Sequence, residues 1–289
     1  MSPAADEHDL EPASLTVTGG VRLAGESMGD GIPIVLAHGL TATRRYVLHG
    51  SKVLPRKGFC TIAYDARGHG QSDGAPAGAG YSYVELSADL GRVIEAQTQG
   101  DPYVLAGHSM GAHTLATHAL ANSRRVAAII VIGPVFNGSP STGESLAYWD
   151  GLADGLETGG AAGFLEAYDH GIDPDWRETM LRIARERLSL HRDPSAVARA
   201  LREVPRSSPF DALSELELCE IPALVVASHD DADPGHPYAV AAEWGERLPH
   251  ATLISEDEGA SPLAWQGDKL SREIVAFCER DEVKQRLER

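Results

Sequence analysis

Short apolar runs alternate with longer segments of helical periodicity along most of the chain. A continuous apolar run predicts a strand that is buried on both faces, and apolar residues three and four positions apart predict an amphipathic helix. The apolar runs lie at residues 32–39, 59–66, 102–109 and 125–135, the helical patterns at 81–97 and 110–122, and two expected antiparallel edge strands within 14–28. Because strand and helix alternate, we expect a parallel sheet wrapped by helices.

The pattern changes between residues 137 and 208, where Gly-rich loops and polar helices replace the apolar runs. Two polar helices are expected at residues 175–192 and 194–204, followed by strand, helix, strand and helix at 221–228, 237–249, 251–258 and 268–288. We therefore expect an α/β core built from residues 1–136 and 209–289, interrupted by a helical cap, or lid, at residues 137–208.

The charge balance limits the partners that this chain can bind. Acidic residues number 42 and basic residues 25, which leaves a formal net charge of −17. This charge argues against nucleic acid or an anionic membrane as a partner and leaves small molecules. No secretory signal or membrane span is visible, so we expect a cytoplasmic protein. The oligomeric state is not defined by the sequence, and a homodimer is compatible with it.

The cysteines and histidines show no pattern of a metal site. The three cysteines, Cys60, Cys219 and Cys278, are widely spaced and set in apolar surroundings, which favours free thiols over disulfides. No Cys/His spacing resembles a zinc-binding pattern. We therefore expect neither a metal nor a cofactor.

The segment Gly107-His108-Ser109-Met110-Gly111 has the pattern G-x-S-x-G between an expected strand and an expected helix. This context favours a nucleophile elbow, in which a tight turn exposes the serine hydroxyl above the sheet edge. Glycines on both sides leave room for the turn and for close packing of the helix. Ser109 is the candidate nucleophile, placed at a helix N-terminus that favours developing negative charge.

Two other segments support that interpretation. Ala37-His38-Gly39-Leu40 ends a buried strand, where a backbone N–H of the following loop can join that of Met110 in holding an oxyanion. In the loop after residue 64, Asp65, Arg67 and His69 are expected to bond one another and nearby backbone, as structural residues.

With these motifs, the chain resembles the α/β-hydrolase superfamily, in its capped esterase, lipase and lactonase branch. The resemblance rests on residues 38–46, 64–74, 107–111, 225–237 and 258–265, and it covers nearly all of the chain except the cap. It implies a mostly parallel eight-stranded sheet flanked by helices, with the cap inserted. It also implies an oxyanion hole formed by the N–H groups of Leu40 and Met110, and a catalytic acid and histidine that follow Ser109 in the chain.

The acid is expected in the loop after the strand at 221–228, where Asp230, Asp231 and Asp233 compete. Counting forward from Ser228 favours Asp231, and counting back from Pro237 favours Asp233. We prefer Asp233, because the residues that follow it match the family's run into the next helix without a gap.

The base is expected in the loop after the last strand, and Ala260 stands at that position. An alanine methyl group cannot accept a proton. Two explanations stay open: a native histidine replaced by design, and natural divergence to another mechanism or to ligand binding. Since the serine motif and the other segments persist, we favour a hydrolase whose base has been removed. His229 and His236 flank the acid loop and approach the site only if that loop is remodelled.

The cap supplies the aromatic side chains that are expected to line a substrate pocket. They are Trp149, Phe164, Tyr168 and Trp176. At helical spacing such residues more often form the core of the cap. The resulting prediction is a serine hydrolase that acts on a small, moderately apolar carboxylic ester or lactone through an acyl-enzyme, inactive in this form. The alternative is a natural member of the fold that is not a hydrolase: a ligand-binding protein, a lyase or an isomerase.

Overall fold

The structure is a computed structural model, and it describes residues 11–169, 172, 174–229, 234–257, 265 and 267–289. A single sheet of eight strands forms its centre. The spatial order is β1-β2-β4-β3-β5-β6-β7-β8, and only the pairs β1-β2 and β2-β4 are antiparallel. The strands are β1 (Ala13–Val17), β2 (Leu23–Met28), β3 (Ile32–Ala37), β4 (Phe59–Tyr64), β5 (Tyr103–His108), β6 (Val126–Ile132), β7 (Ala223–Val226) and β8 (Ala251–Ile254). The predicted mostly parallel eight-stranded sheet is confirmed.

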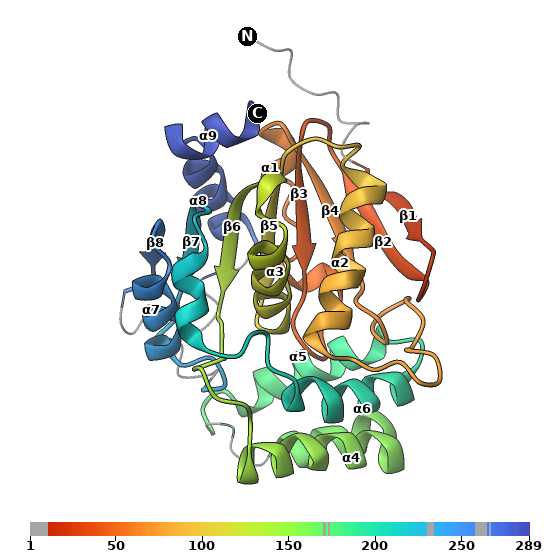
Figure 1. Cartoon of the computed structure of the whole chain (residues 1–289). Coiled ribbons are helices and arrows are strands. Elements are labelled where there is room, and N and C mark those ends of the chain that lie inside the picture. The colour runs from red at the N-terminus through yellow and green to blue at the C-terminus, as the bar shows by residue number, and fades with distance from the viewer. Residues whose placement is uncertain (1–10, 170–171, 173, 230–233, 258–264, 266) are drawn as a thin grey trace.

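The central strands are apolar throughout because helices cover both faces of the sheet (Figure 1). In β3, Val35 packs into the core on one face, and Ile34 and Leu36 pack into the core on the other. One face is covered by α2 (Tyr83–Gln97), α3 (Met110–Ala121) and α7 (Tyr238–Arg247), and the other by α1 (Val53–Arg56), α8 (Asp268–Cys278) and α9 (Asp281–Leu287). Burial of both faces explains why no strand in the middle alternates with polar residues.

The last predicted helix, residues 268–288, is divided in the structure. Helix α8 ends at Cys278, and Arg280 has an extended backbone with φ −68° and ψ 144°. Helix α9 then begins with Asp281 and Glu282, whose carboxylates lie in the first turn, where the helix dipole favours negative charge. The periodic pattern continues across this break, so it predicts one helix where the backbone forms two.

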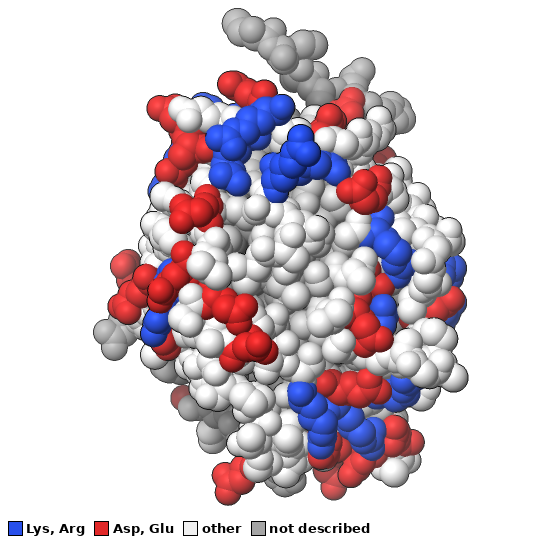
Figure 2. Space-filling model, in the orientation of Figure 1, with Lys and Arg blue, Asp and Glu red and all other residues white. Residues whose placement is uncertain are grey.

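Three helical segments lie together at the carboxyl ends of the parallel strands, between β6 and β7 in the chain (Figure 1). They are α4 (Gly143–Tyr168), α5 (Arg177–Ser189) and α6 (Pro194–Glu203), and we call them the cap helices because they lie in the segment predicted as the cap. That this segment closes a site stays a prediction. Their apolar side chains form a cluster of their own, which includes Leu156, Phe164, Leu188, Val197 and Leu201. Arg202 of α6 pairs with Asp154 of α4, and Arg206, in the turn that follows α6, pairs with Asp150 of α4. Figure 2 shows acidic and basic side chains intermixed over this end of the molecule.

The Gly-rich stretch that the sequence assigns to loops is helical. The backbone of α4 departs from helical geometry only at Gly160, with φ 59° and ψ −147°, so two helical arms meet there. Gly155 and Gly163 bring the arms into backbone contact, because a Cβ at Gly155 would lie 2.5 Å from the carbonyl oxygen of Gly163. The glycines therefore permit the turn and the close approach of the arms.

His191, which follows α5, binds two loops of the core. Its Nδ1 accepts a hydrogen bond from the N–H of Gly70 at 2.8 Å, and its Nε2 therefore donates to the carbonyl of Thr41 at 2.9 Å. The ring also lies 5.6 Å from that of His69, which lies 5.1 Å from His38. Burial lowers the pKa of His191 to about 4 and lowers the pKa values of His69 and His38. These imidazoles stay neutral at neutral pH.

Within the part of the chain that the structure describes, no helix combines the length and the apolar character needed to cross a bilayer.

Replacement of Gly155 by alanine tests the contact between the two arms of α4. The added Cβ meets backbone atoms of Gly163, so we expect a loss of roughly 1–3 kcal/mol in the free energy of unfolding. Gly151→Ala is the matched control, because its Cβ would enter open space in the same helix. That variant should be neutral or stabilised by up to about 1 kcal/mol. Urea denaturation measures both, and equal effects would contradict the close contact.

The buried imidazoles predict a loss of stability in acid. The unfolded chain takes up protons near a pKa of about 6.5, whereas His191 in the folded chain resists protonation down to about 4. Stability therefore falls as the pH falls between those values. In urea denaturation at about pH 7 and about pH 4.5, His191→Asn should reduce this loss by roughly 2 kcal/mol. Replacing the exposed His250 by Gln should leave the loss unchanged, and an identical loss in both variants would contradict the account.

Candidate active site

The turn between β5 and α3 holds Ser109 in a conformation that L-residues rarely adopt. Its φ is 52° and its ψ is −113°, and such a backbone costs of order 1–3 kcal/mol in a residue other than glycine. The N–H of Ser109 donates to the carbonyl of Ile132 at 2.9 Å, and its carbonyl accepts from the N–H of His113 at 3.1 Å. The turn is therefore held by β6 on one side and by α3 on the other.

The glycines of the G-x-S-x-G motif are required by contact distances. A Cβ at Gly111 would lie 2.0 Å from the carbonyl oxygen of Ala37, at the end of β3. A Cβ at Gly107 would lie 2.5 Å from the carbonyl carbon and oxygen of Gly111. The first turn of α3 thus packs directly on β3, and no larger residue fits at either position without moving the backbone.

The loop after β3 runs against the same turn. A Cβ at Gly39 would lie 3.4 Å from Cβ of Ser109, which shows how close this loop is to the serine. Thr41 has a positive φ of 65°, and the N–H of Ala42 donates to the carbonyl of Gly39 at 3.1 Å. Leu40, between them, packs against both the sheet core and the cluster of the cap helices.

Ser109, Leu40 and Met110 line one cavity of about 410 Å³. The structure thus brings together the predicted nucleophile and the two residues predicted to form the oxyanion hole. Much of the remaining wall carries uncharged polar side chains: Asn137, Ser139, Ser141, Thr142, Ser145 and Ser207. Apart from the neutral His113, the wall holds no titratable imidazole, Asp, Glu, Lys or Arg among the described residues. The cavity suits an uncharged group.

A buried pair, His113 and Tyr83, forms part of the same wall. His113 Nε2 accepts from the N–H groups of Val135 and Phe136 at 3.0 and 3.1 Å, so the proton of this imidazole is on Nδ1. That N–H donates to the Tyr83 hydroxyl at 2.9 Å, which leaves the hydroxyl hydrogen of Tyr83 free to donate to a ligand. Burial lowers the pKa of His113 to about 3 and raises that of Tyr83. Both groups are therefore neutral hydrogen-bonding partners.

The four aromatic residues predicted to bind substrate occupy different places. Trp149 lines the cavity of Ser109 and also packs against the cluster of the cap helices. Phe164 and Tyr168 stack with ring centroids 5.8 Å apart and pack within that cluster. Trp176 is half-buried at the start of α5. Only Trp149 lies beside the serine in the described part of the chain, and substrate contact by the other three stays a prediction.

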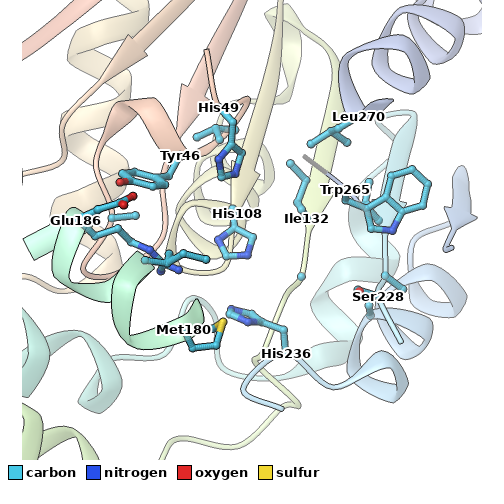
Figure 3. A pocket seen from close by; sticks show the side chains of 18 of the residues that line it. Tyr46, His49, His108, Ile132, Met180, Glu186, Ser228, His236, Trp265 and Leu270 are labelled. Carbon is cyan, nitrogen blue, oxygen red and sulfur yellow. The ribbon is translucent and has the colours of Figure 1, made fainter. Parts of the chain in front are cut away.

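A second cavity, of about 350 Å³, lies on the other side of the turn, and His108 projects into it while Ser109 faces the first. The rings of His108 and His236 face one another with centroids 4.7 Å apart, as Figure 3 shows. One side of this cavity is formed by Tyr46, His49, Met180 and Glu186, and the other by Ser228, Trp265 and Leu270. It therefore extends from the cap helices to the ends of β6 and β7.

Glu256 joins the segments that follow β7 and β8, and no sequence motif marked it. Its Oε1 accepts from the Ser228 hydroxyl and the His229 N–H, both at 2.6 Å, and its Oε2 accepts from Trp265 Nε1 at 2.7 Å. Burial disfavours the charged form, but these hydrogen bonds outweigh it, so the pKa of Glu256 is lowered. A buried, ionised carboxylate thus joins Ser228 and His229 to Trp265, residues that border the segments in which the acid and the base are expected.

The residues predicted as the acid, Asp230, Asp231 and Asp233, lie outside the described residues, and so does Ala260, at the predicted base position. Their places stay predictions. His229 stacks on Tyr238 with ring centroids 3.9 Å apart. His236, beside His108, is the nearer of the two flanking histidines to the turn of Ser109, and its ring lies against Gly133 at the end of β6.

The expected bonding of Asp65, Arg67 and His69 to one another and to nearby backbone is confirmed in part. His69 Nδ1 donates to the carbonyl of Arg67 at 2.9 Å, but the side chains of Asp65 and Arg67 bind other partners. Asp65 binds the Arg44 guanidinium and the N–H groups of Arg44 and Gln71. The Arg67 guanidinium pairs with Asp89 of α2 through two hydrogen bonds, at 2.7 and 2.8 Å. Asp65 and Arg67 thus join their loop to two different elements, which the spacing of the residues does not reveal.

Comparison with known proteins agrees with this geometry. The model of the alpha/beta hydrolase fold family matches residues 32–267. The AB hydrolase superfamily protein YisY of Bacillus subtilis is 26% identical over 269 residues, which are 89% of this chain and 95% of that protein.

Two solved structures superpose on almost the whole chain. They are the esterase EaEST from Exiguobacterium antarcticum, with a TM-score of 0.74, and the enol-lactonase from Burkholderia xenovorans LB400, with a TM-score of 0.73. Each is 20% identical and covers 93% of this chain and 100% of its own. At this identity the likeness shows the fold alone. Because the family model spans most of the chain, the protein belongs to the α/β-hydrolase family.

Proposed function

We propose that this protein is a serine hydrolase of carboxylic esters or lactones, with Ser109 as the nucleophile. The observation that carries the proposal is the backbone of Ser109, held at a φ of 52° beside a cavity that its side chain lines. Strain of this kind persists only where the surrounding contacts impose it, and it is concentrated at functional sites. The esterase and lactonase structures that share the fold support the same class of reaction.

The proposed reaction begins with attack of Ser109 Oγ on the carbonyl carbon, while a base takes the hydroxyl proton. The N–H groups of Leu40 and Met110 donate to the resulting oxyanion, at the N-terminus of α3. The bond to the leaving alcohol then breaks, and the alcohol receives the proton from the base. Water repeats the attack on the acyl-enzyme and releases the acid and the free Ser109.

The base in this proposal is a histidine at position 260, oriented by Asp233 or, in the alternative, Asp231. Alanine at 260 removes the imidazole, so the chain as it stands is proposed to be inactive. Glu256 acts on this part of the site as a positioning residue, because it joins Ser228 and Trp265, which border the two segments. Residues 137–208 are proposed to form a cap that closes the site and selects the substrate.

The substrate group in the Ser109 cavity is proposed to be small, uncharged and moderately apolar. Leu40, Met110, Phe136 and Trp149 supply the apolar surface, and hydroxyl groups surround it. The free hydrogen of the Tyr83 hydroxyl provides a fixed donor for an ether, carbonyl or hydroxyl oxygen of that group.

Alanine at position 260 also favours a second candidate function, a ligand-binding member of the fold that does not hydrolyse its ligand. Such a protein would bind a small molecule with an affinity that does not depend on the Ser109 hydroxyl. The ester hydrolase has the better support because a binding protein gains nothing from a strained serine backbone, which lowers stability.

Restoring a histidine tests the proposed hydrolase. Ala260→His should hydrolyse p-nitrophenyl butyrate roughly 10²- to 10⁴-fold faster than the chain with Ala260, the range typical of a positioned general base. Release of p-nitrophenol measures the rate.

The double variant Ala260→His/Ser109→Ala is the matched control and should return the rate to that of buffer. Equal rates with and without Ser109, or no gain from the histidine, would refute the hydrolase. If the chain with Ala260 already turns over, loss of that activity in His236→Gln would assign the base to His236.

A further inference from the structure

Arg187 of α5 lines the second cavity, and no carboxylate of the described residues forms an ion pair with it. Among the residues that the structure describes, the side chain of Arg187 takes part in no hydrogen bond or ion pair, and its buried Nε lacks an acceptor. Its guanidinium lies over the ring of Tyr46, whose centroid is 5.6 Å from Cζ. A buried donor without an acceptor costs about 1–3 kcal/mol, so an acceptor from a ligand would be stabilising.

The surrounding charges leave this cation uncompensated. Glu186 also lines the cavity, but its carboxylate accepts from Arg182 at 3.3 Å, one helical turn away. Of the described side chains on this wall, two guanidinium groups therefore face one carboxylate, within a chain whose net charge is −17. Because the rest of the protein is acidic, the positive potential is confined to this cavity, and an anion is attracted only there.

Consecutive residues line the two cavities, since Ser109 lines the first and His108 the second. A substrate whose carbonyl lies on Ser109 can therefore extend one arm into each. Met180 and Tyr46 lie on the side of the second cavity away from Ser228 and Trp265 (Figure 3). Arg187 lines the same cavity beside the ring of Tyr46, so an arm there does not need the space where the base is expected.

We infer that the second cavity binds a carboxylate through Arg187, so that the substrate is an ester or lactone that carries a separate carboxylate group. A guanidinium presents two parallel N–H donors that match the two oxygens of a carboxylate. One unpaired guanidinium balances one negative charge, and a phosphate dianion would leave a second charge without a partner. This inference rests on the proposed hydrolase and names the class of its substrate.

A pair of esters of equal length tests the inference in the Ala260→His form. Mono-p-nitrophenyl glutarate carries the carboxylate in the acyl arm, and p-nitrophenyl valerate is its neutral counterpart. A second pair, 4-(butyryloxy)benzoate and phenyl butyrate, carries it in the alcohol arm. In at least one pair, kcat/KM should favour the anionic ester about tenfold or more, and Arg187→Gln should remove that preference.

Two further variants separate the role of Arg187 from a general effect of charge. Arg185→Gln removes the same charge from the exposed side of the same helix and should change the preference less than about twofold. Arg187→Lys keeps the charge but loses the two parallel donors, so it should restore only part of the preference. No preference in either pair, or a preference that survives Arg187→Gln, would overturn the inference.

A binding measurement on the chain with Ala260 keeps the two proposals distinguishable. Titration of monomethyl glutarate by calorimetry should show saturable binding that weakens about tenfold or more in Arg187→Gln and is unchanged in Arg185→Gln. If the chain binds monomethyl glutarate in this way but hydrolyses no ester, the proposed carboxylate site is supported and the proposed hydrolase activity is refuted. Hydrolysis of neutral esters without such binding would retain the hydrolase and refute the carboxylate site.

Discussion

The contact between the first turn of α3 and the end of β3 is the constraint on which the rest of the site depends. Gly111 lies so close to the carbonyl of Ala37 that a Cβ would stand 2.0 Å from it. With the helix held there, the chain can leave β5 and enter α3 only through a sharp turn, and Ser109 takes the positive φ of that turn. The strain at the serine is thus imposed by packing of the sheet and helix, and it places the side chain in a cavity rather than in the core.

The same loop that runs against Ser109 also contacts the cap helices and His191, which follows α5. Thr41, next to Leu40, accepts a hydrogen bond from His191, and Leu40 contacts both the sheet core and the cap cluster. The neutral state of His191 is needed for this arrangement, since Nδ1 must accept from Gly70 while Nε2 donates. One buried imidazole therefore links the end of α5 to the proposed oxyanion loop, and the packing of Leu40 adds a second contact.

Much of the fold could be predicted from the sequence because the strands are buried on both faces. Runs such as residues 125–135 contain little but apolar residues, and the observed β6, Val126–Ile132, lies within that range. The serine turn could be predicted because its glycines are required by contacts that any such turn makes. The cap was harder to predict, since glycines that usually indicate loops permit two helical arms to touch at Gly155 and Gly163.

Residues whose roles depend on distant partners could not be predicted. Glu256, His191 and Arg187 belong to no local motif. Glu256 and His191 make hydrogen bonds to residues remote in the chain. The buried Nε of Arg187 has no hydrogen-bond acceptor among the described residues. The division of the last predicted helix at Arg280 was missed for a similar reason, because the apolar period continues through a break that only the backbone angles reveal.

Site-resolved labelling with a fluorophosphonate tests the central claim most directly, because this probe reacts only with an activated hydroxyl. In the Ala260→His form, peptide mapping by mass spectrometry should find one phosphonyl adduct, on Ser109, and the unaltered chain should label far more slowly. An adduct on another residue, or none in the histidine form, would contradict the claim that the strained serine at this turn is the nucleophile.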